Sequence, residues 1–132
     1  MESILKYTLF VIAVVALFTA VNVLIGGATA IPGVTGSVEA AVDNELRFFS
    51  VFWLAFGGLC FWVAMNIQKQ LKLIPFILCV FFLGGVGRLC SFLLVGEPGN
   101  VLFLAMIVEL ILPTIIFITY QAQRKKQLPQ RS

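Results

Sequence analysis

The chain has 132 residues, of which 61% are hydrophobic and only 11% are charged, and its formal net charge is +3. Charged residues make up about a quarter of a typical soluble domain. This composition therefore excludes an ordinary soluble protein and predicts an all-α integral membrane protein, whose backbone polar groups are satisfied within helices. Histidine is absent, and Cys60, Cys79 and Cys90 have no metal-ligand spacing, so neither a metal nor another cofactor is expected.

Four apolar runs predict four membrane-spanning helices. The first covers about residues 7–30, and its roughly 24 residues exceed the apolar core of a signal peptide, which has about 7 to 15. We therefore expect this segment to be retained, although Ala28-Thr29-Ala30 resembles a signal-peptidase site. The other runs cover about residues 46–66, 73–95 and 101–120. Together they predict a four-helix bundle in which residues 1–132 form a single transmembrane domain.

The segments between the runs contain residues typical of helix starts and turns. Asp43, Asn44 and Glu45 offer a side-chain cap and acidic charge at the start of the second helix. Pro75 suits the first turn of the third helix. Residues 96–100, with the sequence Gly-Glu-Pro-Gly-Asn, predict a turn before the fourth helix.

Basic residues indicate how the helices are oriented in the membrane. They concentrate at the N-terminus, in the turn after the second helix and in the tail at 121–132, as Lys6, Lys69, Lys72, Arg124, Lys125, Lys126 and Arg131. The positive-inside rule makes these segments cytoplasmic, which predicts an N-in/C-in, multi-pass protein of the bacterial inner membrane. Arg47 is the only basic residue near the opposite, acidic side. Because the basic residues report topology, no nucleic-acid partner is expected.

Arg88 is the most informative residue, because it lies within the third apolar run behind three glycines. An ionisable residue inside a span is a candidate functional site, and Glu109, the only acid in the fourth run, is its expected partner. Pro113 lacks the N–H that would bond to the carbonyl of Glu109, so a helix kink is predicted there. The glycines are expected to pack closely against another helix or to leave room beside the guanidinium. They are Gly84, Gly85 and Gly87.

Depth along the helices predicts that polar residues from all four spans meet. At about 1.5 Å of rise per residue, Asn22, Arg88 and Glu109 fall at similar heights in the outer half of the bilayer. Glu45 and Arg47 approach that height from the outer end of the second helix. These five residues are the predicted polar cluster, and the inner half of the bilayer has none comparable.

Four motifs follow one another along the chain. They are Asp43-Asn44-Glu45-Leu46-Arg47-Phe48, Phe82-Leu83-Gly84-Gly85-Val86-Gly87-Arg88-Leu89 with Ser91, Gly96-Glu97-Pro98 and Glu109-Leu110. In this order they resemble the bacterial DUF4345 family of small four-span membrane proteins. The resemblance extends over nearly the whole chain and implies a fold and a set of motif positions rather than an activity. At the level of fold the chain is also similar to the DoxX and EXPERA-type four-helix bundles, some of which bind lipid-like molecules.

The leading functional hypothesis is a pocket that opens toward the outer leaflet and binds a lipid or another amphipathic small molecule. The polar cluster would hold the head of the ligand, and phenylalanine side chains would line its tail. One alternative is a structural or assembly subunit in which the Arg88 and Glu109 pair fixes helix register. Another is a membrane-embedded enzyme with Glu109 or Glu45 as general acid or base. A homo-oligomer through Gly57-Gly58 or the glycines of the third span is compatible with each of these.

Overall fold

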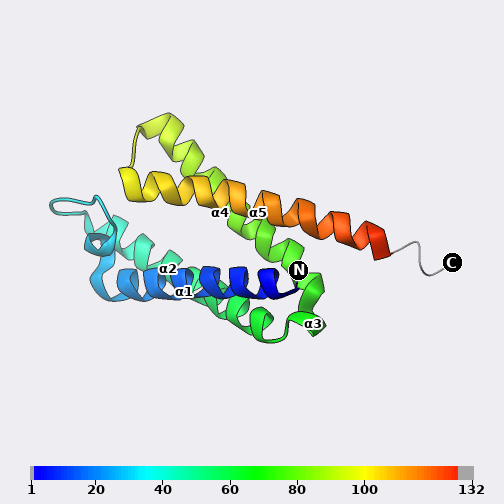
Figure 1. The fold of residues 1–132 in the computed structure, drawn as a ribbon. Helices are drawn as coiled ribbons and strands as arrows, with labels where there is room; N and C mark the ends of the chain where they lie inside the picture. Colours follow the sequence, from blue (N-terminus) through cyan, green and yellow to red (C-terminus); the bar gives the residue numbers. More distant parts are fainter. Residues whose placement is uncertain (1, 128–132) are drawn as a thin grey trace. The chain divides into compact units, whose positions relative to one another are not determined.

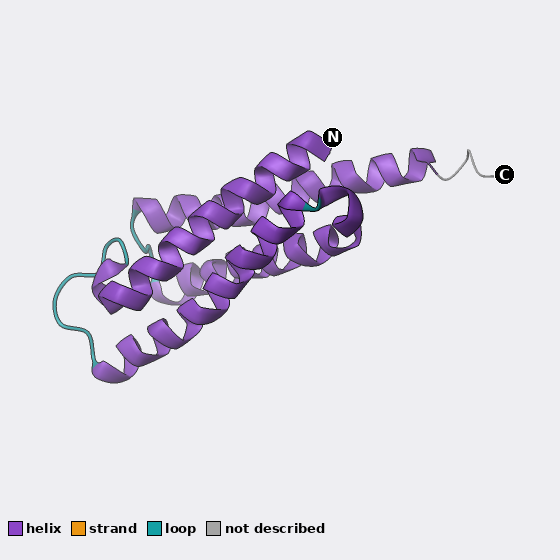
Figure 2. Ribbon diagram, turned by 90° about the horizontal axis from the view of Figure 1, so that it is seen from below, coloured by secondary structure: helices purple, strands orange, loops and turns teal. Residues whose placement is uncertain are grey.

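The computed structural model describes residues 2–127, and within that range every regular element is a helix (Figures 1 and 2). The four long helices are α1 (Glu2–Gly26), α2 (Ala40–Met65), α4 (Ile74–Val95) and α5 (Asn100–Gln127). The short elements are η1 (Gly27–Ala30), α3 (Ile67–Gln70) and η2 (Leu71–Leu73). The predicted all-α class with four long helices is confirmed.

Four segments of the described chain are long and apolar enough to cross a membrane, and they are Ser3–Ala30, Ala40–Met65, Ile67–Val95 and Asn100–Gln121. Their surfaces agree with this assignment. Leu94 and Val95, at the end of α4, are 85% and 86% exposed, which is costly in water but favourable against lipid tails. The N-in/C-in orientation stays a prediction.

The helices form two compact units, divided between Leu71 and Lys72. The first unit contains α1 and α2 with their connection, and the second contains α4 and α5. The prediction that residues 1–132 form a single domain stays a prediction.

In the first unit, α1 and α2 approach each other closely because small residues line their contact. A Cβ atom added to Gly57 would lie 2.9 Å from Leu17 Cγ, so only glycine fits at this position of α2. Gly57 therefore serves packing within the unit. Trp53 Nε1 donates a 2.9 Å hydrogen bond to Thr19 Oγ1, which joins the two helices by a polar contact. The small buried residues of α1 are Ala13, Ala16 and Ala20.

The start of α2 corrects one prediction. The helix begins at Ala40, its N-cap residue is Glu39, and there is no side-chain cap hydrogen bond. The predicted cap at Asp43, Asn44 and Glu45 is therefore wrong. The physical reason is that Asp43 lies inside the first turn, where its carboxylate is engaged by Ala28 and Arg47.

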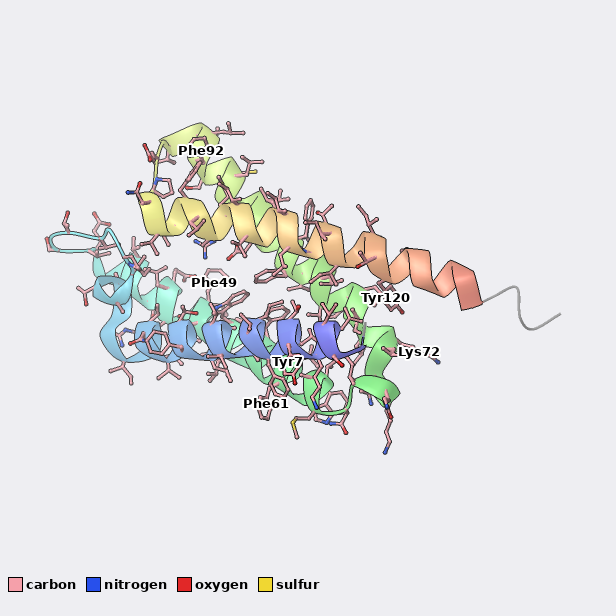
Figure 3. All side chains as sticks on the ribbon, in the orientation of Figure 1. Tyr7, Phe49, Phe61, Lys72, Phe92 and Tyr120 are labelled. Atoms are coloured by element: carbon pink, nitrogen blue, oxygen red, sulfur yellow. The ribbon has the colours of Figure 1, made fainter. Side chains whose placement is uncertain are left out.

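In the second unit, α4 and α5 form a hairpin joined at Gly96–Gly99 (Figure 1). Gly96 and Gly99 have φ values of 116° and 89°, which favour glycine. Pro75 occupies the first turn of α4, as predicted. Phe92, labelled in Figure 3, lies near this turn. Its ring is 5.6 Å from that of Phe103, measured between centroids.

At its far end, α5 continues beyond the fourth span. The span that is apolar enough to cross a membrane ends at Gln121, close to the predicted residue 120, whereas α5 continues to Gln127. Helix formation does not stop where the apolar run stops, because the residues that follow include good helix formers such as Gln, Arg and Lys. Residues 128–132 of the predicted tail lie outside the described residues.

Candidate polar site at Arg88 and Glu109

Arg88 and Glu109 form the ion pair that the sequence predicts. Arg88, on α4, donates from Nε to Glu109 Oε2, on α5, over 2.9 Å. The Glu109 side chain is 9% exposed, whereas that of Arg88 is 39% exposed. The pair therefore joins the two helices of the second unit, with a nearly buried carboxylate and a half-exposed guanidinium.

The guanidinium of Arg88 is only partly used by this contact. Arginine has five N–H donors, and the bond to Glu109 takes the one on Nε. Among the described residues, the two terminal nitrogens of Arg88 have no hydrogen-bond partner. Four donors are therefore available to another molecule.

The glycines before Arg88 differ in role. A Cβ at Gly85 would lie 2.9 Å from Leu110 Cγ and 3.0 Å from the backbone carbon of Glu109, so close packing is present there. At Gly84 the Cβ would make an ordinary 3.5 Å contact with Glu109 Oε2. A Cβ at Gly87 would meet no described atom within 4 Å. Gly87 therefore has no close contact with α5, and its close packing against another helix stays a prediction.

Pro113 follows Glu109 by one helical turn and is buried within α5. The helix continues through it to Gln127, and the kink itself stays a prediction. Pro113 also lines an open apolar cavity of about 290 Å³ between α4 and α5. The other lining residues are Pro75, Leu78, Cys79, Phe82, Thr114, Phe117 and Ile118.

This cavity was missed by sequence reasoning, which placed the pocket among polar residues. None of the five residues of the predicted polar cluster lines it. A groove between two helices depends on their crossing angle and on side-chain size at facing positions, which hydrophobic periodicity does not report. The two prolines were visible in the sequence, but nothing there indicated that they line the same cavity.

Three other predicted site residues, Asn22, Glu45 and Arg47, belong to the first unit. Asn22 Nδ2 donates to the carbonyl of Phe18 one turn earlier, over 2.8 Å. Glu45 is exposed. Arg47 pairs with Asp43 over 2.8 Å, four residues earlier on the same helix. Whether these three residues join Arg88 and Glu109 in one cluster stays a prediction.

Arg47 and Asp43 hydrogen-bond to backbone groups at the end of α1 and in the connection between α1 and α2. Asp43 Oδ1 accepts a 2.8 Å hydrogen bond from the Ala28 N–H, and Asp43 Oδ2 accepts from Arg47 Nε. Arg47 Nη1 donates to the carbonyl of Leu24, in the last turn of α1. Carbonyls at a helix end lack intrahelical partners, so Arg47 caps α1. In the sequence, the i, i+4 spacing of Asp43 and Arg47 was the signal that could have predicted their ion pair.

No group of three or more His, Cys, Asp or Glu side chains able to hold a metal ion occurs in the part of the chain that the structure describes. The cysteines there are free thiols: Cys60 is buried, and Cys79 and Cys90 are exposed.

Residues 4–120 match the family described as "Domain of unknown function (DUF4345)". The chain belongs to the DUF4345 family. The match covers all four predicted spans of this DUF4345 protein, including both partners of the Arg88 and Glu109 pair, and confirms the resemblance in the motifs. Neither a curated protein nor a solved structure matches the chain.

Proposed function

We propose that this DUF4345 protein is a multi-pass protein of the bacterial inner membrane that binds a lipid or another amphipathic small molecule at Arg88. The observation that supports the proposal is the partly used guanidinium, which makes one hydrogen bond to Glu109 and is 39% exposed. By its position along α4, Arg88 lies within a membrane-length apolar helix rather than at its end.

Hydrocarbon offers no water to the remaining N–H groups of Arg88. Unsatisfied polar groups in lipid cost several kcal/mol each by the usual transfer arguments, roughly 2–7 kcal/mol per group. An amphipathic molecule with acceptor oxygens in its head would satisfy them without moving Glu109. The ligand head is therefore assigned to the terminal nitrogens of Arg88.

The apolar cavity offers a site for the tail of the same ligand. Its lining residue nearest to Glu109 along α5 is Pro113, four residues or about 6 Å of helix rise away. Its volume of about 290 Å³ is near the lower end for ligand pockets, and Phe82 and Phe117 contribute aromatic lining. The hydrocarbon chain of the same ligand would fill this cavity. No cofactor is part of this proposal.

Lipid retention tests the proposal. The full chain, purified in a mild detergent, is expected to carry a bound amphipath in native mass spectrometry, and Arg88→Ala is expected to lose it. Gly87→Ala is the matched control, because Gly87 neighbours Arg88 but faces open space. Both variants are checked for insertion and monodispersity. Equal retention by the wild type and by properly inserted Arg88→Ala protein would overturn the proposal.

A structural or assembly subunit is the second candidate, and the burial of Glu109 favours it, since a nearly buried carboxylate needs a cationic partner in any case. Replacement of both residues, as Arg88→Met with Glu109→Leu, distinguishes the two functions. A structural role predicts that this variant keeps both stability and cellular phenotype. Ligand binding predicts that it keeps stability and loses retention.

A further inference from the structure

Building on the proposed binding site, we infer that it selects an amphipath whose head is uncharged and rich in acceptor oxygens, such as ester or ketone carbonyls, over one with an anionic head. The inference comes from the state of charge of the pair. Arg88 is already neutralised by Glu109 Oε2 at 2.9 Å, while its terminal nitrogens remain available.

The two helical segments that carry the pair contain no further charge to balance an anion. Residues 74–95 contain Arg88 as their only charged residue, and residues 100–121 contain only Glu109. An anionic head on the terminal nitrogens would give the site a net negative charge and would bring two anions to the same guanidinium. In a low-dielectric environment such a charge is strongly disfavoured. A carbonyl oxygen accepts the same N–H groups and leaves the site neutral.

Glu109 is thus a specificity-determining residue that acts through Arg88. Its replacement by Gln makes a decisive variant, because the amide oxygen can still accept from Arg88 Nε and the shape is nearly unchanged. The site then carries one unbalanced positive charge, which is best neutralised by an anionic head. Glu109→Gln is therefore expected to reverse the preference without abolishing binding. A residue that only holds the helices together would not show such a reversal.

The test is a competition between two lipids with identical chains. The full-length protein in detergent micelles is mixed with equimolar dioleoylglycerol and dioleoyl phosphatidic acid, and the bound species are counted by native mass spectrometry. Retention by the double variant Arg88→Met with Glu109→Leu, which lacks the guanidinium and leaves no unpaired carboxylate, is the baseline for unspecific binding. The wild type is expected to retain mainly dioleoylglycerol, and Glu109→Gln is expected to shift the ratio of the two lipids at least about tenfold toward phosphatidic acid.

The outcomes separate this inference from the proposed function. If the wild type retains both lipids above the baseline but prefers phosphatidic acid, or if Glu109→Gln leaves the ratio unchanged, the inference is overturned and the binding site stands. If the wild type retains neither lipid above the baseline of the double variant, and its co-purified lipids are also those of that variant, the proposed function fails and the inference fails with it.

Discussion

The two units of this DUF4345 protein each contain one arginine–carboxylate pair, and the pairs have nearly the same length but different surroundings. Arg47 Nε lies 2.8 Å from Asp43, and Arg88 Nε lies 2.9 Å from Glu109. Arg47 also donates to the carbonyls of Leu24 and Ile25 at the end of α1. Arg88 makes no second hydrogen bond among the described residues.

The difference shows why an ion pair alone does not identify a site. The Asp43 and Arg47 pair satisfies backbone groups, namely the Ala28 N–H and two carbonyls of α1. The hydrogen-bonding groups of this pair are therefore used within the protein. Among residues 2–127, the Arg88 and Glu109 pair satisfies no backbone group and leaves donors available. Unused donors on a membrane arginine, rather than its charge, distinguish a candidate binding site from a structural contact.

The largest expected effect on stability comes from replacing only one partner of the Arg88 and Glu109 pair. Arg88→Met leaves Glu109 nearly buried without a cation, which is expected to lower the free energy of unfolding by about 3–5 kcal/mol. Adding Glu109→Leu removes the orphaned charge and is expected to recover most of that loss. Unfolding titrations in mixed micelles measure both values. A double variant as unstable as the single one would show that the pair contributes more than mutual neutralisation.

The corresponding double replacement in the first unit is expected to recover none of the lost free energy of unfolding. Asp43→Leu with Arg47→Met leaves the Ala28 N–H and the Leu24 carbonyl without their partners. Each lost hydrogen bond to a charged group lowers stability, and less so where water reaches the site. The unfolding free energy of the double variant should therefore stay at least as low as that of either single variant. If the double variant recovered the free energy of unfolding, the Asp43 and Arg47 pair would not differ in this respect from the Arg88 and Glu109 pair.

The packing beneath the second pair can be tested with two glycines of α4. Gly85→Ala places a Cβ against Leu110 and Glu109 and is expected to lower the free energy of unfolding by about 1–3 kcal/mol. Gly87→Ala, two residues later, meets open space and is expected to be neutral or slightly stabilising. The same unfolding titrations serve as the measurement. Equal effects at the two positions would mean that Gly85 does not set the approach of α4 to α5.

A substitution that fills the apolar cavity is expected to have the smallest effect on stability. It should nevertheless reduce ligand binding clearly. Cys79→Trp fills the groove that Cys79 lines, whereas Cys90→Trp adds the same side chain to another exposed position of α4. Only Cys79→Trp should reduce retention of dioleoylglycerol in native mass spectrometry, about fivefold or more, since it competes with the tail for space. Similar retention by both variants would place the tail elsewhere.

Hydrophobic run length and turn residues were enough to predict the four long helices, because a bilayer fixes the minimum length of a span. The Arg88 and Glu109 pair was also predictable, since each is the sole charged residue of its span. The early start of α2 was not, because Asp43 is a typical cap residue and its actual partners, Ala28 and Arg47, depend on how the chain turns after α1.

Other features of the candidate site depend on geometry that a sequence pattern does not contain. Helical spacing puts Gly85 on the face of Arg88 and Gly87 on another face, but that the face of Gly85 packs against α5 is known only from its contacts. The apolar cavity depends on which side chains of α4 and α5 face one another, so Pro75 and Pro113 gave no indication of it. The number of unused donors on Arg88 likewise emerged only from the hydrogen-bond geometry.

The central claim is that the terminal nitrogens of Arg88 hold the head of an amphipathic ligand. An experimental density map of the full-length protein in lipid nanodiscs tests it most directly. We predict elongated density with one end at hydrogen-bond distance, about 2.7–3.2 Å, from a terminal nitrogen of Arg88, and with its tail along the groove lined by Cys79 and Phe117. A well-resolved Arg88 whose terminal nitrogens donate only to groups of the protein would contradict the claim.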